Sequence, residues 1–482
     1  MPVQKIPPAL EDTLALLRQM SSQSADLLIH RAVIGGIPCA LLGCEGMLSS
    51  AVLTEAVLSP LNALPPAENA DALLSQIRER VLIALDAPAV YDTASAFRLL
   101  HSGFVLLAAD GASELLAFGM QGKASRSISE PSGEASILGA HEGFTEVIRT
   151  NMAMLRSRMK TPLLTFEMRR AGSLSQTDIC LCWLSDRTDP RLLTHIRQAL
   201  DAADPETVLT PGYLQPYLEQ GSGLFDSVGM TERPDVLASR LLEGRVGVFI
   251  DGVPFVLTAP RLFVESFQSV DDYAFKPWYA AFIRYVKYAP FFLTLLLPAL
   301  YVAVSMHHPE LLNRTLLLIL TQAEADEPLS LPLEAAGVLL MYEMIREAGL
   351  RLPKTVGGAV GIVGGIIIGD AAVAAGLVST PMLTVTAIAV TAGFILPDLA
   401  PAISVLRLLF LAAGGLWGLT GIALLGVAVL WELCAAGSFG YPVTAPLSPF
   451  HLRGMRDVLT RLDFRRMARG GFTVEEYYDA HQ

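Results

Sequence analysis

Four acidic residues stand within or beside the most apolar part of the chain: Glu334, Glu343, Glu347 and Asp370. A carboxylate at bilayer depth is costly, so such residues face water or a polar partner. Acids along an aqueous path also attract cations to the mouth of a pore. These four are therefore the candidate pore or signalling residues. The alternative is that these carboxylates simply lie in a solvent-exposed acidic loop and on a solvent-exposed helix face.

A second group of polar residues lies in two motifs, TERPD at Thr231–Asp235 and LEGR at Leu242–Arg245. The hydroxyl of Thr231 can accept backbone N–H bonds near a helix start, and Arg233 can bridge carboxylates. We interpret the motifs as a structural clasp, with ligand contact as the alternative. Their residues are Thr231, Glu232, Arg233, Pro234, Asp235, Glu243, Gly244 and Arg245.

Composition narrows the classes of function. The net charge is −12, without a basic patch that would neutralise nucleic-acid phosphates. The chain has no Ser-His-Asp, Cys-His, phosphate-loop or HExxH arrangement, and its eight histidines are scattered. We therefore expect no enzyme activity, no cofactor or metal site, and no nucleic-acid partner.

The elements that must position these residues are apolar segments in the C-terminal half. A helix needs about 20 mostly apolar residues to cross a bilayer. The segments that qualify are 289–306, 356–378, 382–398 and 405–433. The charged residues of 329–350 predict an amphipathic helix at the interface or beside a water-filled path. We therefore expect an all-α polytopic membrane domain over 287–450 with about four transmembrane helices.

Glycines recur every four residues in the second of these segments, at Gly357, Gly361, Gly365 and Gly369. They share one helix face, where small residues let another helix approach closely. The pattern predicts helix packing, either within the chain or between copies in an oligomer.

Basic residues flank the apolar block, with Lys276, Arg284 and Lys287 before it and arginines from Arg453 onward after it. The distribution favours cytoplasmic ends, which requires an even number of crossings. The opening residues Met1–Glu11 lack the apolar stretch of a signal peptide.

The residues before the block predict a cytoplasmic α/β (α+β) region of two subdomains. Within it, Asp110-Gly111 and Asp251-Gly252 predict hairpin turns. The expected boundaries are 1–126 for the first subdomain, 127–143 for a linker, 144–286 for the second subdomain and 451–482 for a cytoplasmic tail.

Several segments match one known family in order along the chain. Three of them are TERPD, LEGR and DGVPF, the last at Asp251–Phe255. Through these and further segments the sequence resembles the spore germination protein A family, the A subunits of GerA-type germinant receptors, over roughly 125–465. The other matching segments are HEGFTEVIRTNMAMLRSR at His141–Arg158, QTD at Gln176–Asp178, HPELL at His308–Leu312, REAGLRLP at Arg346–Pro353, IIIGDAAVAAG at Ile366–Gly376 and SFGYPVTAP at Ser438–Pro446. His141 and Asp370 depart from the Arg and Gln usual in the family.

The resemblance implies a multi-pass subunit of a nutrient germinant receptor in the spore inner membrane. It implies that the chain relays nutrient sensing to ion release, as an ion-conducting homo-oligomer in one reading. The implied partners are a transporter-like B-type subunit, a lipoprotein C-type subunit and membrane lipid. The alternatives are a non-receptor paralogue associated with the spore dipicolinic-acid channel and a secondary transporter. An inverted repeat, the usual mark of a transporter, is not evident.

Overall fold

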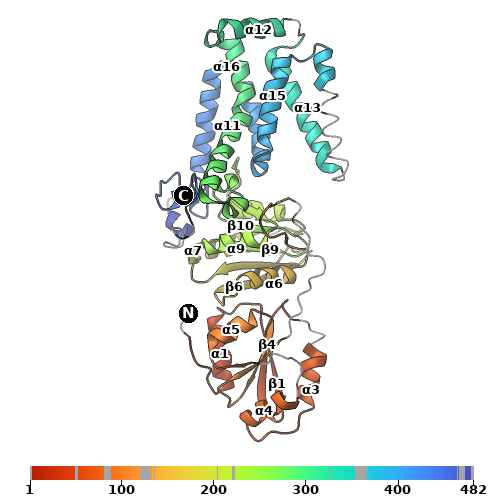
Figure 1. Ribbon diagram of the computed structural model, residues 1–482, viewed down its shortest axis with the longest axis vertical. Coiled ribbons are helices and arrows are strands. Elements are labelled where there is room, and N and C mark those ends of the chain that lie inside the picture. Colours follow the sequence, from red (N-terminus) through yellow and green to blue (C-terminus); the bar gives the residue numbers. More distant parts are fainter. Residues whose placement is uncertain are drawn as a thin grey trace.

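The computed structural model describes residues 3–48, 53–80, 88–119, 131, 133–134, 136–203, 205–219, 223–325, 327–352, 365, 367, 369–463, 465 and 473–478. Two α/β subdomains and a bundle of helices follow one another along the long axis of the molecule (Figure 1). We call residues 3–119 the first subdomain, 144–275 the second subdomain and 277–435 the helical region. The second subdomain lies between the other two parts.

The first subdomain is an antiparallel sheet covered by helices on both faces. Alternate residues of its strands point to opposite faces, so that Leu106 packs with one set of helices and Leu107 with the other. The strand order is β1-β2-β4-β5-β3. The strands are β1 (Leu27–Ile34), β2 (Ile37–Cys44), β3 (Ala89–Val90), β4 (Phe104–Ala109) and β5 (Leu115–Gly119). The helices are α1 (Leu10–Met20) and α5 (Thr93–Leu100) on one face, with η1 (Leu53–Leu58), α3 (Ser59–Asn62) and α4 (Ala70–Arg80) on the other.

The second subdomain repeats this architecture with the strand order β6-β7-β9-β10-β8. Phe166 and Phe249 pack on one side against α6 and α9, while Val248 packs on the other side against α7. Its strands are β6 (Leu164–Ala171), β7 (Thr177–Leu184), β8 (Gly229–Thr231), β9 (Val246–Ile250) and β10 (Val256–Ala259). Its helices are α6 (Ile148–Arg158), α7 (Pro190–Ala202), η2 (Pro211–Tyr213), α8 (Gln215–Glu219) and α9 (Pro234–Leu242).

The two subdomains therefore share one chain order: a helix, a hairpin, a helical crossing, a short edge strand, a helix and a second hairpin. Both second hairpins turn at the predicted Asp-Gly pairs, where Gly111 and Gly252 have φ values of +94° and +84°. Glycine adopts such values without steric cost. Both sheets are antiparallel, so the two subdomains, which together we call the soluble region, belong to the α+β class.

A buried ion pair joins the two subdomains. Nε and Nη2 of Arg156 in α6 donate to the two carboxylate oxygens of Asp26, at 2.8 and 2.9 Å. The two side chains are 2% and 4% exposed. The backbone N–H of Ala25 also donates to the carbonyl of Phe166, at 2.9 Å. The orientation of one subdomain on the other thus depends on a desolvated charge pair.

Among the described residues of the helical region, two segments have the length and composition of membrane spans, Pro277–His307 and Pro397–Ala435. The expected number of four spans is therefore not confirmed. Most of 356–378 lies outside the described residues. The range 382–398 contains most of α15, whose 14 residues extend about 21 Å, and the beginning of the short helix η5 (Pro397–Leu399). The helices are α11 (Pro277–His307), α12 (Arg314–Glu324), α13 (Leu331–Arg351), α15 (Thr380–Gly393) and α16 (Ala400–Ala435).

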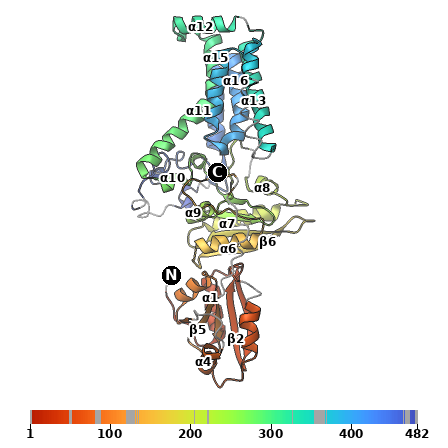
Figure 2. The same cartoon turned by 45° about the vertical axis from the view of Figure 1, so that its right-hand side comes forward.

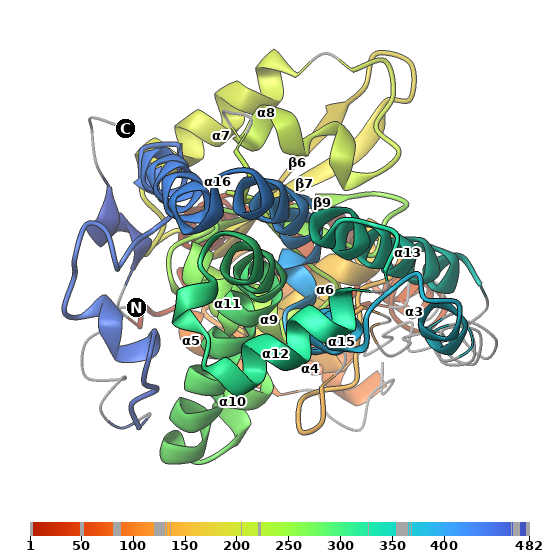
Figure 3. The ribbon, with the colours of Figure 1, turned by 90° about the horizontal axis from the view of Figure 1, so that it is seen from above.

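The amphipathic segment expected over 329–350 forms α13, which runs along the bundle beside α15 (Figure 1). Its neighbour in sequence, α12, instead lies across the end of the bundle farthest from the second subdomain (Figures 2 and 3). The first span also starts earlier than its apolar run, because the helix is continuous from Pro277 rather than from 289.

The helix α16 changes direction at Gly418, whose φ of 61° and ψ of −147° are not helical. A Cβ at Gly414 would lie 3.3 Å from Cδ1 of Ile422, and one at Gly418 would lie 3.0 Å from Cβ of His307 at the end of α11. Ile403 and Leu433, near opposite ends of α16, belong to one hydrophobic cluster. The expected span 405–433 is thus a helical hairpin whose two ends both lie near the second subdomain.

The chain after α16 returns to the second subdomain. Phe439, Tyr441 and Val474 are buried in the same cluster as α7 and β9. The Tyr441 hydroxyl donates to Oδ2 of Asp189, at 3.1 Å. The short elements here are β11 (Gly437–Ser438), β12 (Tyr441–Pro442), η6 (Gly454–Asp457) and η7 (Val474–Tyr477). The described part of the expected tail 451–482 is thus packed against the second subdomain, and we call 437–478 the docked tail.

Loss of the Asp26–Arg156 pair should destabilise the soluble region strongly. In Asp26→Asn, the buried Arg156 guanidinium loses its counter-charge, which costs about 3–5 kcal/mol. Pulse proteolysis in urea of the purified full chain measures this change. The matched control is Glu11→Gln, which removes the exposed Glu11–Arg31 pair and should cost less than about 1 kcal/mol. Equal effects of the two substitutions would contradict a structural role for the buried pair.

Candidate functional site at the junction with the helical region

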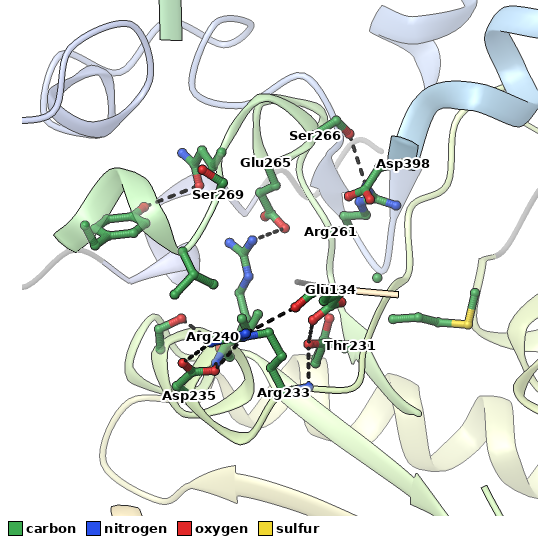
Figure 4. Close-up of a pocket in the computed structure, with 18 of the residues that line it drawn as sticks. Glu134, Thr231, Arg233, Asp235, Arg240, Arg261, Glu265, Ser266, Ser269 and Asp398 are labelled. Carbon is green, nitrogen blue, oxygen red and sulfur yellow. Dashed lines mark hydrogen bonds and ion pairs between the residues drawn. The ribbon is translucent and has the colours of Figure 1, made fainter. Parts of the chain in front are cut away.

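A cavity of about 530 Å³ lies where the second subdomain meets the helical region. One wall comes from β8 and α9, which carry the TERPD motif, and another from Lys287 of α11 and the turn between α15 and α16 at Pro397 and Asp398. Glu134 of the linker and Asp457 of the docked tail complete it. Figure 4 shows its charged side chains pointing toward one another from these separate elements. The cavity is therefore lined by the linker, the second subdomain, the helical region and the docked tail.

Arg233 is the centre of the TERPD motif and is 1% exposed. Its Nε and Nη2 donate to the two carboxylate oxygens of Asp235, at 3.1 and 2.8 Å. Its Nη1 and Nη2 also donate to the carbonyls of Glu134 and Ala140, at 3.1 and 3.0 Å. The guanidinium thus contacts one carboxylate, at the start of α9, and two backbone carbonyls of the linker, rather than bridging several carboxylates.

Thr231 lies in β8 rather than in the helix cap expected from the sequence. Its hydroxyl accepts the backbone N–H of Arg233, at 3.1 Å, and donates to Oε2 of Glu134, at 2.7 Å. The carbonyl of Glu232 accepts the backbone N–H of Phe144, at 2.7 Å. Pro234 begins α9, where its missing N–H costs no helical hydrogen bond.

The LEGR motif belongs to a second cluster of ion pairs, in which Arg240, Glu243 and Glu265 line the cavity. Arg245 contacts Glu243 at 2.8 Å, forms an ion pair with Glu265 and donates to the carbonyl of Pro260. Arg240 lies 3.1 Å from the other oxygen of Glu265. Burial alone would raise the pKa of Glu265, but Arg240 and Arg245 together hold it below its ordinary value. Gly244 has a φ of +87°, and a Cβ there would meet the carbonyl oxygen of Arg187 at 2.6 Å.

Two polar contacts cross directly from the second subdomain to the helical region. Arg261 lies 2.9 Å from Oδ2 of Asp398, at the start of α16, and 3.5 Å from Asp226. The backbone N–H of Leu224 donates to Oε1 of Glu432, near the end of α16, at 2.7 Å. Both ends of the α16 hairpin are therefore connected to loops of the soluble region.

A third connection runs through the beginning of α11. Arg284 is fully buried and lies 3.1 Å from Asp272, of α10 (Asp271–Ala274), and 2.7 Å from Asp457 of the docked tail. Lys287 lies 3.0 Å from the same Asp272. Tyr273 donates its hydroxyl to Asp457, at 2.7 Å. Sequence reasoning treated Arg284 and Lys287 as orientation signals and missed Asp272 and Asp457, because their pairing joins distant segments.

Glu134 has an unusual protonation equilibrium in this cavity. Burial raises its pKa from 4.5 to about 7, and the charges of Asp398 and Glu232 act in the same direction. The Thr231 hydroxyl and Arg233 oppose the shift. The carboxyl that holds the linker to TERPD therefore gains or loses its proton near neutral pH.

The candidate pore residues do not form one site. Glu334 is buried and accepts bonds from the N–H and hydroxyl of Ser379, at 2.6 and 2.8 Å, which joins α13 to the start of α15. Glu347 is paired with Arg351 on the exposed side of α13. Asp370 is exposed.

The remaining candidate, Glu343, lies between two arginines inside the bundle. Its carboxylate contacts Arg346 at 2.7 Å and Arg407 of α16 at 2.8 Å. Arg346 also donates to the hydroxyl of Ser404, at 3.1 Å. Glu343 thus connects α13 to α16.

The predicted glycine face can be followed at two of its four positions. Gly357 and Gly361 lie outside the described residues. A Cβ at Gly369 would lie 3.7 Å from Leu383 of α15, whereas the position at Gly365 is open. Close packing within the chain is therefore seen at Gly369 alone of the two described positions.

No group of three or more His, Cys, Asp or Glu side chains that could hold a metal ion occurs among the described residues. The charged groups of the junction cavity are instead arranged as arginine–carboxylate pairs. These pairs join residues of the second subdomain to one another and, at Arg261–Asp398, to the helical region.

Comparison with known proteins identifies relatives over nearly the whole chain. Residues 15–470 match the family described as Bacillus/Clostridium GerA spore germination protein. Spore germination protein KA of Bacillus subtilis (strain 168) is 36% identical over 95% of this chain and 85% of its own length. The uncharacterized membrane protein YfkQ of the same organism is 33% identical over 96% of this chain and 91% of its own. Among solved structures, the N-terminal domain of the A subunit of the Bacillus megaterium spore germinant receptor GerK3 is 29% identical, covers 55% of this chain and 99% of its own, and has a TM-score of 0.43.

Glu134 should make the clasp sensitive to pH. Because its pKa is about 7 in the folded chain and 4.5 in an unfolded one, its contribution to stability declines as pH rises through this interval. Hydrogen exchange of residues 136–143, corrected for intrinsic rates, should show more protection at pH 6 than at pH 8. Glu134→Gln should remove the difference, whereas Glu142→Gln, at an exposed partner of Arg158, should preserve it. An unchanged pH profile in Glu134→Gln would refute this assignment.

Proposed function

The chain belongs to the Bacillus/Clostridium GerA spore germination protein family, and from this premise we propose that it is the A subunit of a nutrient germinant receptor. In this role it relays nutrient sensing to ion release across the spore inner membrane. The observation that supports the relay is that both ends of the α16 hairpin are connected to loops of the second subdomain, through Arg261 and Asp398 in the junction cavity and through Glu432 outside it.

The relay requires a soluble region that moves as a unit against the helices. The Asp26–Arg156 pair supports this, because it joins the two subdomains through desolvated charges. Arg233 and Arg284 extend the same connection to the linker, to α11 and to the docked tail. A displacement of the soluble region would therefore act on α11 and α16 together.

The proposed topology is multi-pass with both ends in the cytoplasm. Its support is that the start of α11 and the end of α16 both lie against the second subdomain, so the chain between them crosses any membrane an even number of times. Basic residues at Lys276 and after Arg453 favour the cytoplasmic side.

Ion release through a homo-oligomer of this chain is the proposed final step, with B-type transporter-like and C-type lipoprotein subunits as partners. Asp370 and Gly365 support an assembly of copies, because both are exposed on the same segment of the bundle. A carboxylate at such a position would attract cations to a shared path.

The second candidate function is that of a non-receptor paralogue. Its support is the 33% identity to a relative whose name, uncharacterized membrane protein YfkQ, assigns no receptor role. Genes for B-type and C-type subunits beside the gene for this chain would favour the receptor, and their absence would favour the paralogue.

Charge exchange across the junction tests the relay. In proteoliposomes that contain the chain with its B-type and C-type subunits, Arg261→Asp or Asp398→Arg should reduce nutrient-dependent ion flux at least about fivefold. The combined exchange should restore part of it, because the pair is re-formed with opposite polarity. Arg31→Glu, at an exposed position of the first subdomain, is the control.

The same assay tests the conducting role. Glu343→Ala or Asp370→Ala should alter the size or ion selectivity of the flux if these carboxylates act on the path. No nutrient-dependent flux in the wild-type complex, or flux unchanged in both variants, would contradict ion conduction by this chain.

A further inference from the structure

Inside the helical region, one carboxylate forms ion pairs with two arginines. Glu343 accepts from both Arg346 and Arg407, and Arg407 is 3% exposed. The Tyr342 ring lies 5.5 Å from the Arg407 guanidinium. The cluster therefore has a net charge of +1 within an apolar bundle, which is costly without a further counter-charge.

The described residues near the cluster do not supply that counter-charge. The Nε atoms of Arg346 and Arg407 are buried without a hydrogen-bond partner in the described part of the chain. Glu347 is occupied by Arg351, and no described ion pair connects Asp370 to either arginine. The sequence from Leu352 to Gly369 contains no acidic residue, and α15 contains no charged residue. No further counter-charge for the cluster is thus evident among the described residues, and Arg346, whose side chain is 29% exposed, is the arginine that an anion from outside the chain can reach.

Arg346 also lines an apolar groove of about 550 Å³ between α13, α15 and the segment around Gly365 and Gly369. Apart from Arg346, its walls are almost wholly uncharged: Val338, Met341, Tyr342, Ile345, Leu383 and Val390 are among them. From Val338 to Gly349 the groove extends about 16 Å along α13, which suits one acyl chain.

The position of Arg346 along the bundle suits a headgroup. It lies about 8 Å from the end of α13 at Arg351. That end points toward the second subdomain, away from α12 (Figure 1). The charged end of the groove is thus near the membrane surface on the side of the soluble region, and the apolar end extends toward the bilayer centre.

We propose that this groove binds an anionic phospholipid, with its phosphate on Arg346 and one acyl chain along α13 and α15. The phosphate supplies the missing negative charge, and a guanidinium is well suited to hold it. The apolar walls match a lipid tail, and the groove borders lipid-facing residues such as Leu340 and Met344, which are 50% and 67% exposed. The inference depends on the membrane location of the chain and not on its role in a receptor.

Native mass spectrometry of the full chain, released from nanodiscs, tests the proposal. Nanodiscs contain phosphatidylcholine alone or an equal mixture with phosphatidylglycerol of the same acyl chains. The wild-type chain should retain phosphatidylglycerol at least about tenfold over phosphatidylcholine, and Arg346→Gln should abolish this preference. Arg351→Gln, at an exposed arginine on the same helix, should leave it unchanged.

A second variant keeps the test valid if Arg346→Gln fails to fold. Ala387→Phe fills the groove from α15 without changing any charge and should also displace the lipid. Equal retention of the two lipids by the wild-type chain would overturn the proposal. So would full competition by glycerol phosphate, which would assign a free-anion site. A lipid-independent dimer that is lost in Arg346→Gln would assign the counter-charge to a second copy and would also overturn it.

Discussion

Arginine side chains withdrawn from water hold the successive parts of this molecule to one another. A guanidinium in the interior must be met by carboxylates or carbonyls, since an unpaired buried charge is costly. Arg156 meets this requirement between the two subdomains, Arg233 between the linker and α9, and Arg284 between α11 and the docked tail. Each pairing joins segments that are distant in sequence, so the arrangement of the parts depends on these few contacts.

Local features of this fold could be predicted from the sequence because their causes are local. The Asp-Gly turns at Asp110 and Asp251 need only neighbouring residues, and the pairing of Arg233 with a carboxylate is evident from the acids beside it. The partners of Arg261 and Arg284 could not be predicted, because Asp398 and Asp457 reach them only through the packing of separate elements.

In the helical region, too, the sequence could not predict features that depend on tertiary packing. The run 405–433 is mostly apolar, and its few polar residues, Arg407, Thr420 and Glu432, do not predict a reversal at Gly418, where the backbone is not helical. The acids of α13 were predicted as a group, yet Glu334 joins helices, Glu343 forms ion pairs with two arginines and Glu347 faces outward. Residue type indicated where charge would be present in the bundle, and tertiary contacts decided what each charge does.

The docked tail gives the molecule an order of assembly. A ribosome makes the chain from its N-terminus, and domains generally fold as they emerge. The first subdomain has all its strands by Gly119, whereas one face of the second subdomain is covered by Phe439, Tyr441 and Val474. That face can be covered only after residues 439–474 have been made, and these follow α11 to α16 in the chain. The core of the second subdomain is therefore completed after the helical region has been synthesised.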